Sequence, residues 1–92
     1  MKTILITGAS HGIGKAIAEK LAACGMRLFL NCRSSKETLY EYAVKLSETY
    51  HVLCTPLFYD VSDHKQVHAM FEEICALGES IDILINNAGI SH

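Results

Sequence analysis

Short apolar runs alternate with longer segments of helical periodicity along this chain. The apolar runs predict strands near residues 3–7, 27–31, 52–59 and 81–86. The segments between them predict helices near residues 13–24, 35–49 and 63–77. Strands separated by helical crossovers imply parallel pairing through right-handed βαβ units. The pattern therefore predicts an α/β fold, and we find no repeat or interdomain linker.

The predicted helices carry local signals at their ends and along one face. Ser34 with Glu37 fits a capping box for the second helix, and Ser62 or Asp63 can cap the third. Apolar residues recur on one face of each of these helices, which predicts core-facing stripes. The stripes comprise Leu39, Ala43, Leu46 and Tyr50, followed by Val67, Met70, Phe71 and Ile74.

A glycine-rich loop, residues 7–14, follows the first apolar run and opens the first predicted helix. A strand, a glycine turn and a helix N-terminus in that order cradle a pyrophosphate, because glycines admit close backbone approach and helix amides favour an anion. The residues expected to contact the phosphates are Gly8, Ala9, Ser10, His11, Gly12, Ile13 and Gly14. The alternative is a purely structural turn. A P-loop is disfavoured, since Ala9 replaces its first glycine and Ala16 its metal-binding hydroxyl.

Bulk composition limits the classes of partner. The chain has 92 residues, half of them hydrophobic, and a formal net charge of −2. No basic stripe or basic helix face favours nucleic acid or an anionic membrane. No segment approaches the roughly 18 apolar residues of a transmembrane helix, and the first apolar run is too short for a signal peptide. These features predict a cytoplasmic protein of at most one domain that acts on small molecules.

Four cysteines and two histidines spaced four residues apart are the candidates for a metal or disulfide site. The cysteines are Cys24, Cys32, Cys54 and Cys75. None forms a C-x-x-C pair, so we predict reduced thiols that serve as small core residues. His64 and His68 have metal-ligand spacing, but Lys65 stands where the H-E-x-x-H motif has its glutamate. We therefore predict a solvated helix face there and no metal site.

Two further motifs accompany the glycine loop: Asp60-Val61 after the third apolar run and Asn86-Asn87-Ala88-Gly89 after the fourth. In this order and spacing, the chain resembles the short-chain dehydrogenase/reductase family in its classical form, over nearly its whole length. The run Asn31-Cys32-Arg33-Ser34-Ser35 and the closing Asn-Asn-Ala-Gly-Ile are most similar to bacterial 3-oxoacyl-[acyl-carrier-protein] reductases.

The resemblance implies the amino-terminal part of a doubly wound Rossmann fold, with parallel strands in the order 3-2-1-4 and helices on both faces. Residues 1–92 would form a truncated NAD(P)-binding domain. That order places the third strand at the sheet edge, which suits Pro56, because proline cannot donate to a ladder. It also brings the glycine loop and the Asn86–Gly89 segment to one crevice.

The end of the second strand discriminates between the two nicotinamide cofactors. A carboxylate there would bind the ribose of NAD, whereas an arginine accommodates the 2′-phosphate of NADP. Arg33, with no acid between Asn31 and Lys36, predicts NADP. A solvated surface cation is the alternative for Arg33. His11 stands where many NADP-preferring relatives carry arginine, and a neutral histidine attracts phosphate less.

The resemblance also assigns roles to the two later motifs. Asp60 is expected to hydrogen-bond the adenine amino group, and Val61 to contact the base through its backbone. The alternative for Asp60 is a cap on the following helix. Asn87, Ala88 and Gly89 are expected to line the adenosine ribose and the glycine loop. Asn86 is expected to brace the sheet.

Family chemistry is hydride transfer between nicotinamide and a carbonyl or alcohol, with a serine, an asparagine and a Tyr-x-x-x-Lys pair. None of the tyrosines here has a lysine four residues later, so no catalytic residue is assigned. The chain is expected to be the cofactor-binding portion of an NADP(H)-dependent reductase, favouring a carbonyl such as a 3-oxoacyl thioester on an acyl carrier protein. The alternative is a catalytically inactive truncated remnant that binds nucleotide. Full-length relatives are expected to be homo-oligomers.

Overall fold

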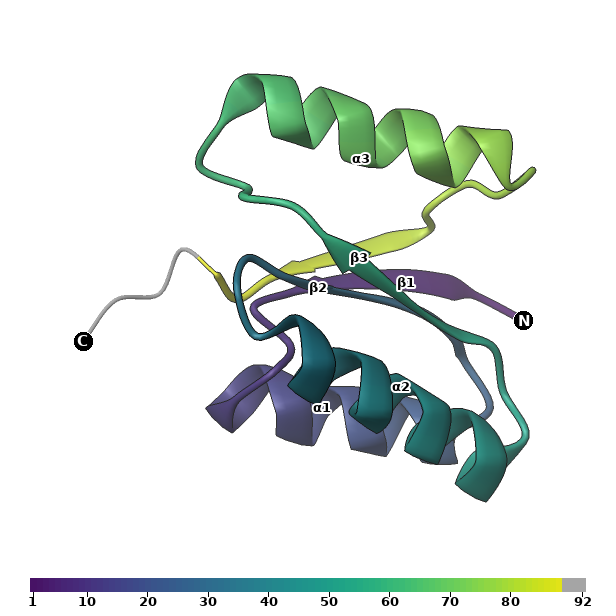
Figure 1. The fold of residues 1–92 in the computed structure, drawn as a ribbon. Coiled ribbons are helices and arrows are strands. Elements are labelled where there is room, and N and C mark those ends of the chain that lie inside the picture. Colours follow the sequence, from purple (N-terminus) through teal and green to yellow (C-terminus); the bar gives the residue numbers. More distant parts are fainter. Residues whose placement is uncertain (89–92) are drawn as a thin grey trace.

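A computed structural model of the chain describes residues 1–88 and places a parallel sheet between two helical layers (Figure 1). The strands are β1 (Thr3–Thr7), β2 (Arg27–Cys32), β3 (Cys54–Phe58) and β4 (Ile83–Asn86), in the order β3-β2-β1-β4. Helices α1 (Gly12–Ala23) and α2 (Lys36–Tyr50) cover one face, and α3 (His64–Ala76) covers the other. The predicted α/β fold, strand order and two-sided helical cover are confirmed.

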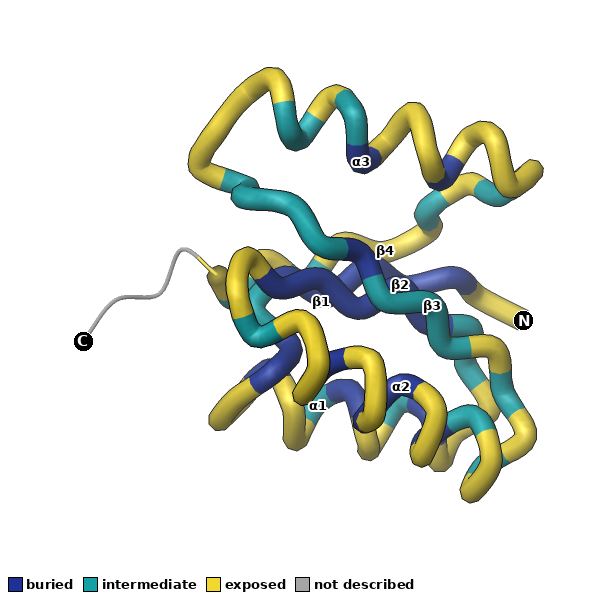
Figure 2. Tube along the Cα trace, in the orientation of Figure 1, coloured by how far each residue is buried: buried dark blue, intermediate teal, exposed yellow. Residues whose placement is uncertain are grey.

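Side chains of the central strands alternate between two hydrophobic cores, as strand geometry requires. On β1, Ile4 and Ile6 pack toward α1 and α2, whereas Leu5 packs toward α3. On β2, Phe29 joins Leu5 on the α3 side. Because both faces are covered, β1 and β2 are buried along nearly their whole length (Figure 2). This explains why both strands appear in the sequence as continuous apolar runs.

Strand β3 lies at the sheet edge, as the presence of Pro56 in this strand led us to expect. The amide of Leu28 donates to the carbonyl of Leu53 at 2.9 Å, so the odd-numbered residues of β3 bond to β2. The amide of Cys54 points the other way and donates to Ser47 Oγ at 3.2 Å. Pro56 shares that outward direction, and its missing N–H therefore leaves no gap in the ladder.

The two predicted helix caps have different outcomes. Asp63 begins α3, and its carboxylate accepts a hydrogen bond from the amide of Lys65 at 2.9 Å, as predicted. The capping box of Ser34 and Glu37 is wrong, because Ser35 is the N-cap of α2 and makes no side-chain cap bond. The Ser35 hydroxyl instead lies 3.1 Å from His11 Nε2, and this long-range contact takes the place of the local cap.

The predicted apolar stripes are buried in α2 and only partly buried in α3. Leu39, Ala43 and Leu46 are buried against the sheet. In α3, Met70 and Ile74 are buried, but Phe71 is 38% exposed. The apolar face of α3 is thus wider than the part of it that packs against the sheet.

The cysteines do not all serve as core residues. All of them are free, Cys32 is buried and Cys54 is half-buried. Cys24 and Cys75 are exposed, so the prediction that they pack in the core is wrong. Cys24 is the C-cap residue of α1, and Cys75 lies in the last turn of α3.

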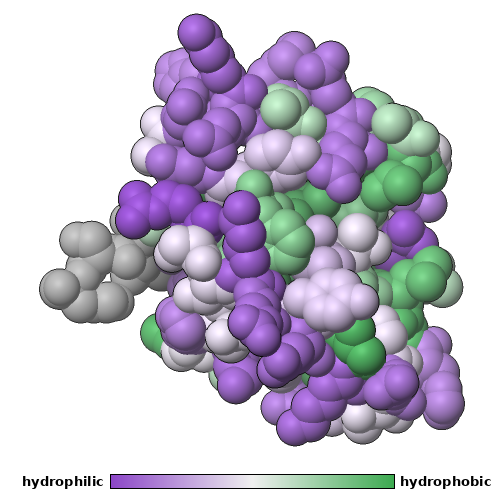
Figure 3. All heavy atoms as spheres, in the orientation of Figure 1, coloured by the Kyte–Doolittle hydropathy of each residue, from purple (hydrophilic) through white to green (hydrophobic). Residues whose placement is uncertain are grey.

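The outer faces of the helices are largely hydrophilic, and hydrophobic residues show mainly between the two helical layers (Figure 3). Within residues 1–88, no helix combines the length and apolar character needed to cross a bilayer. Exposed apolar side chains include Leu53 on the loop before β3 and Leu84 on β4.

Tyr42 links the two helices beneath the sheet and gives a test of this packing. Its hydroxyl donates to the carbonyl of Lys15 at 2.8 Å, and burial raises the pKa of Tyr42 to about 12. Since ionised Tyr42 opposes folding, stability should fall as pH rises from the ordinary tyrosine pKa near 10 toward about 12. Tyr42→Phe should weaken this alkaline loss and lower the unfolding free energy at pH 7 by about 1 kcal/mol.

Urea unfolding at pH 7 and pH 11 measures both effects. Tyr40→Phe is the matched control, because Tyr40 is 57% exposed on the same helix. If Tyr42→Phe and Tyr40→Phe changed the unfolding free energy equally at both pH values, the role given to the Tyr42 hydroxyl would be wrong.

Candidate functional site

A polar cavity of about 480 Å³ opens at the carboxyl ends of β1, β2 and β3. Its lining residues are Gly8, Ser10, His11, Asn31, Cys32, Arg33, Ser34, Ser35, Tyr59, Asp60, Val61, Ser62 and Ala88. Asn31 and Cys32 belong to the end of β2, and the others come from the segments that follow the four strands. Of the residues predicted from sequence, this cavity gathers Gly8, Ser10, His11, Arg33, Asp60, Val61 and Ala88.

The glycine loop on one side of the polar cavity has the backbone of a sharp turn. Gly8 and Gly12 have φ angles of +63° and +55°, which L side chains rarely adopt. Ala9 lies beneath the loop, fully buried, and its amide donates to the carbonyl of Asn31 at 2.9 Å. Ala9 therefore anchors the loop to β2 rather than offering its amide to a ligand.

Helix α1 begins at this loop with its first amides left without a side-chain cap. Its N-cap residue, His11, makes no side-chain cap bond, and its first turn carries no acidic residue. The amides of Gly12, Ile13 and Gly14 belong to that first turn, whose N–H groups have no partner within a helix. The side chain of Ile13 is 62% exposed. The start of α1 thus has the donors and the dipole that attract an anion.

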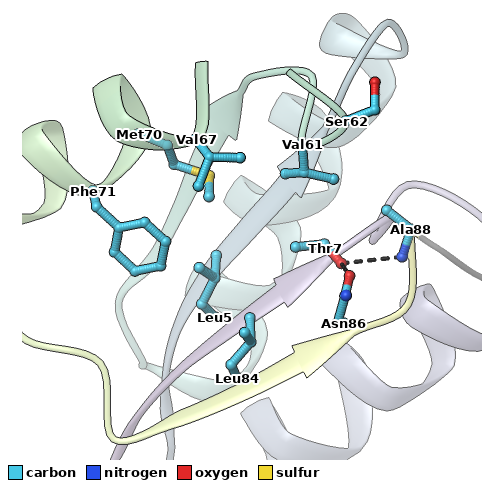
Figure 4. Close-up of a pocket in the computed structure, with 10 residues that line it drawn as sticks. All are labelled: Leu5, Thr7, Val61, Ser62, Val67, Met70, Phe71, Leu84, Asn86 and Ala88. Carbon is cyan, nitrogen blue, oxygen red and sulfur yellow. Dashed lines mark hydrogen bonds between the residues drawn. The ribbon is translucent and has the colours of Figure 1, made fainter. Parts of the chain in front are cut away.

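The end of β4 holds the glycine loop in place. Thr7 Oγ1 donates to Asn86 Oδ1 at 2.9 Å and accepts from the amide of Ala88 at 3.0 Å (Figure 4). Asn86 thus braces β4 against β1, as predicted. Asn87 Nδ2 donates to the carbonyl of Gly8 at 3.0 Å. Gly89, which was predicted to line the same site, lies outside the described residues.

Gly14 is packed so closely that only glycine fits. A Cβ at Gly14 would overlap the carbonyl oxygen of Gly8 and would lie 2.6 Å from Asn87 Nδ2. The turn, the first helical residues and the end of β4 therefore form one interlocked unit. The role of Asn87 seen here is to support the loop, and it does not line the polar cavity.

The opposite wall of the polar cavity carries Asp60. Its carboxylate accepts from the Ser62 hydroxyl at 2.7 Å and from the Ser62 amide at 3.0 Å. These hydrogen bonds, with a smaller contribution from the charge of Arg33, hold the pKa of Asp60 below its usual range. Asp63 rather than Asp60 caps α3, so the capping alternative for the Asp60 side chain is wrong.

A second, apolar pocket of about 300 Å³ lies between α3 and the strands β1 and β4 (Figure 4). Val67, Met70 and Phe71 of α3 line it, opposite Leu5 and Leu84. It shares Val61, Ser62 and Ala88 with the polar cavity. Part of the α3 stripe that was predicted to be core therefore faces a cavity.

His64 and His68 of α3 line neither the polar cavity nor the apolar pocket. His68 Nε2 is 3.5 Å from Glu72 Oε1, and both side chains are mostly exposed. Within residues 1–88, no three His, Cys, Asp or Glu side chains gather closely enough to hold a metal ion.

Sequence reasoning missed several residues of the polar cavity. Asn31, Ser34 and Ser35 line it but were not predicted to lie at a ligand site. A signal was present for Asn31, because a polar residue interrupts an otherwise apolar strand. For the serines, the signal was their place directly after Arg33.

A family model described as short chain dehydrogenase matches residues 2–92. This chain belongs to the short-chain dehydrogenase family. The match covers each of the motifs that carried the resemblance. Membership also accounts for the strand order and for the position of the glycine loop at the carboxyl edge of the sheet.

Curated short-chain dehydrogenases match nearly the whole chain. An NADP-dependent 3-hydroxy acid dehydrogenase from Schizosaccharomyces pombe is 44% identical over 91 residues, which are 98% of this chain and 35% of that protein. A 3-oxoacyl-[acyl-carrier-protein] reductase from Aquifex aeolicus is 38% identical over 90 residues, or 98% of this chain and 36% of that protein. The chain thus spans about a third of the length of these relatives.

Solved structures of short-chain dehydrogenases share this fold. L-sorbose reductase from Gluconobacter frateurii, complexed with NADPH and L-sorbose, has a TM-score of 0.90 and 37% identity, covering 99% of this chain and 34% of its own. A short-chain dehydrogenase from Sphingobium yanoikuyae in complex with NADPH has a TM-score of 0.84 and 38% identity, covering 100% and 35%. Both structures are complexes with NADPH.

Proposed function

We propose that this chain is the NADP-binding portion of a short-chain oxidoreductase. The observation that carries the proposal is the polar cavity at which His11, the N-cap residue of the uncapped helix α1, meets Arg33 and Asp60. In this assignment the amides of Gly12, Ile13 and Gly14 bind the pyrophosphate. Residues Gly8, Ser10 and His11 shape the phosphate turn, which Ala9 anchors from below.

The adenine and its ribose are assigned to residues on the two walls of the polar cavity. Asp60 would accept a hydrogen bond from the adenine amino group, since its carboxylate stays ionised, and Val61 would contact the base through its backbone. Ala88, with Asn87 behind the loop, would flank the adenosine ribose, and Gly89 is proposed to extend that contact. A Cβ built on Gly8 would lie only 3.0 Å from Ala88 Cα, so the glycine loop and the end of β4 pack directly against each other and form one wall beside the ribose.

Preference for NADP rests on the residues that follow β2. Arg33 lines the polar cavity together with Ser34 and Ser35, at the start of α2. Ser35 leaves that helix without a side-chain cap, so its first amides can also face an anion. A guanidinium and hydroxyls beside a helix N-terminus suit a 2′-phosphate better than the paired hydroxyls of NAD. The named relatives that use or bind NADP support the same choice.

The cofactor supplies the hydride, and the residues of this chain bind and orient it. We propose that the whole protein transfers hydride to or from a small carbonyl or alcohol, such as a 3-oxoacyl thioester carried on an acyl carrier protein. It would act in the cytoplasm as a homo-oligomer, with residues 1–92 as part of one Rossmann domain. The alternative is an inactive nucleotide-binding remnant, and assay of the full-length protein with NADPH and a 3-oxoacyl thioester distinguishes the two.

Calorimetry with NADPH and NADH on the full-length protein tests the cofactor assignment. Wild type should bind NADPH more tightly than NADH. Arg33→Ala should weaken NADPH binding by about 10- to 100-fold, because a charged hydrogen bond is worth about 1.5–3 kcal/mol, and should leave NADH binding unchanged. Lys20→Ala is the control, since it removes one exposed positive charge at the other end of α1. Equal or tighter binding of NADH by wild type would overturn the preference.

A further inference from the structure

Asn31 is a buried polar residue for which the proposed function has no task. It is 1% exposed within β2, directly after the fully buried Phe29 and Leu30. Burying an amide without hydrogen-bond partners costs several kcal/mol, so a polar side chain at such a position needs partners.

The partners of Asn31 lie in two other segments of the chain. Its Nδ2 donates to the carbonyl of Tyr59 at 2.9 Å and to that of Leu57 at 3.3 Å. Its own carbonyl accepts the amide of Ala9 at 2.9 Å. One residue thus ties the glycine loop, the end of β2 and the end of β3 together.

The bond to Tyr59 lies just beyond the reach of the sheet. The pairing of β2 with β3 ends at Cys32 and Phe58, so the carbonyl of Tyr59 follows the last ladder position. The Asn31 side chain replaces the missing ladder partner at that point. It thereby fixes the chain immediately before Asp60 and Val61, which form one wall of the polar cavity.

We propose that Asn31 is a positioning residue for the adenine half of the nucleotide, an inference that rests on the proposed function. Through Tyr59 it sets the place of Asp60 and Val61, and through Ala9 it sets the place of the glycine loop. Asn31 thus ties both walls to β2, while the amide of Asp60 is also held from α3 by Gln66 Oε1 at 2.7 Å. Removing the side-chain amide of Asn31 should displace Asp60 and Val61. The backbone amides at the start of α1 should stay in position.

The test replaces Asn31 and measures cofactor affinity in the folded full-length protein. Asn31→Leu removes the donor at similar volume and should weaken binding of NADPH and of adenosine 2′-phosphate by about tenfold, the equivalent of one buried hydrogen bond. Asn31→Ala serves as the second variant where Asn31→Leu does not fold. In the ligand-free protein, the amides of Asp60 and Ser62 should exchange with solvent faster than in wild type.

The matched control is Ile4→Val, which removes a buried methylene at the amino end of β1, away from the cavity, and costs about 1 kcal/mol. If Asn31 only stabilised the fold, Asn31→Leu and Ile4→Val would both bind NADPH with wild-type affinity below their unfolding temperatures. That outcome would overturn the inference and leave the proposed function standing. A wild-type protein that binds neither cofactor would overturn both.

Discussion

Gly14→Ala should abolish detectable NADPH binding, with a loss of about 100-fold or more in affinity. The new methyl group would overlap the carbonyl of Gly8 and lie 2.6 Å from Asn87 Nδ2, so either the loop or α1 must move. Movement takes the first-turn amides away from the pyrophosphate, and loss of two charge-assisted hydrogen bonds costs about 3 kcal/mol or more. Titration of the variant with NADPH, beside its circular dichroism spectrum, measures binding and folding separately.

Gly25→Ala is the matched control for that substitution. Gly25 has a φ of +82°, and nothing lies within 4 Å of a Cβ built there. Alanine at such a φ costs about 1–2 kcal/mol of backbone strain but should leave the NADPH dissociation constant unchanged. If Gly14→Ala bound NADPH as tightly as Gly25→Ala does, the glycine loop and the start of α1 would not be the phosphate site.

Local chemistry made much of the fold and the glycine loop predictable. Uninterrupted apolar runs identified β1 and β2 because both of their faces are covered by helices. Pro56 identified the edge strand, since only an outward-facing position tolerates its missing donor. The carboxyl ends of parallel strands meet at one edge, which brought the glycine loop, Arg33 and Asp60 together.

Contacts between distant segments could not be read from the sequence. Helix α2 has Ser35 rather than Ser34 as its N-cap residue, and the hydroxyl of Ser35 bonds His11 of a distant segment. Asn31 could be noticed as a polar interruption, but its bonds to Tyr59 and Ala9 depend on the paired strands. Exposure of Cys24 likewise depends on which side of α1 the sheet occupies.

Phe29→Ala should cause the largest loss of stability of any single substitution considered, about 3–5 kcal/mol. Phe29 is fully buried in the smaller of the two cores, where Leu5 and Leu57 of the sheet meet Met70 and Ile74 of α3. Removing the ring leaves a cavity at the centre of the surface that attaches α3. Equilibrium unfolding in urea measures the loss, and Leu53→Ala is the control, because Leu53 is 61% exposed and should lose less than about 0.5 kcal/mol.

Phe29→Ala should destabilise α3 more than it destabilises α1 and α2. The other core, under α1 and α2, does not include Phe29, so amides of α1 should keep their protection from exchange when those of α3 lose it. Loosening of α3 would also displace Val61, which packs against the smaller core and lines the polar cavity. Affinity for NADPH should then fall together with α3 protection in Phe29→Ala. Uniform loss of protection across α1 and α3 would instead mean that the two cores unfold as one unit.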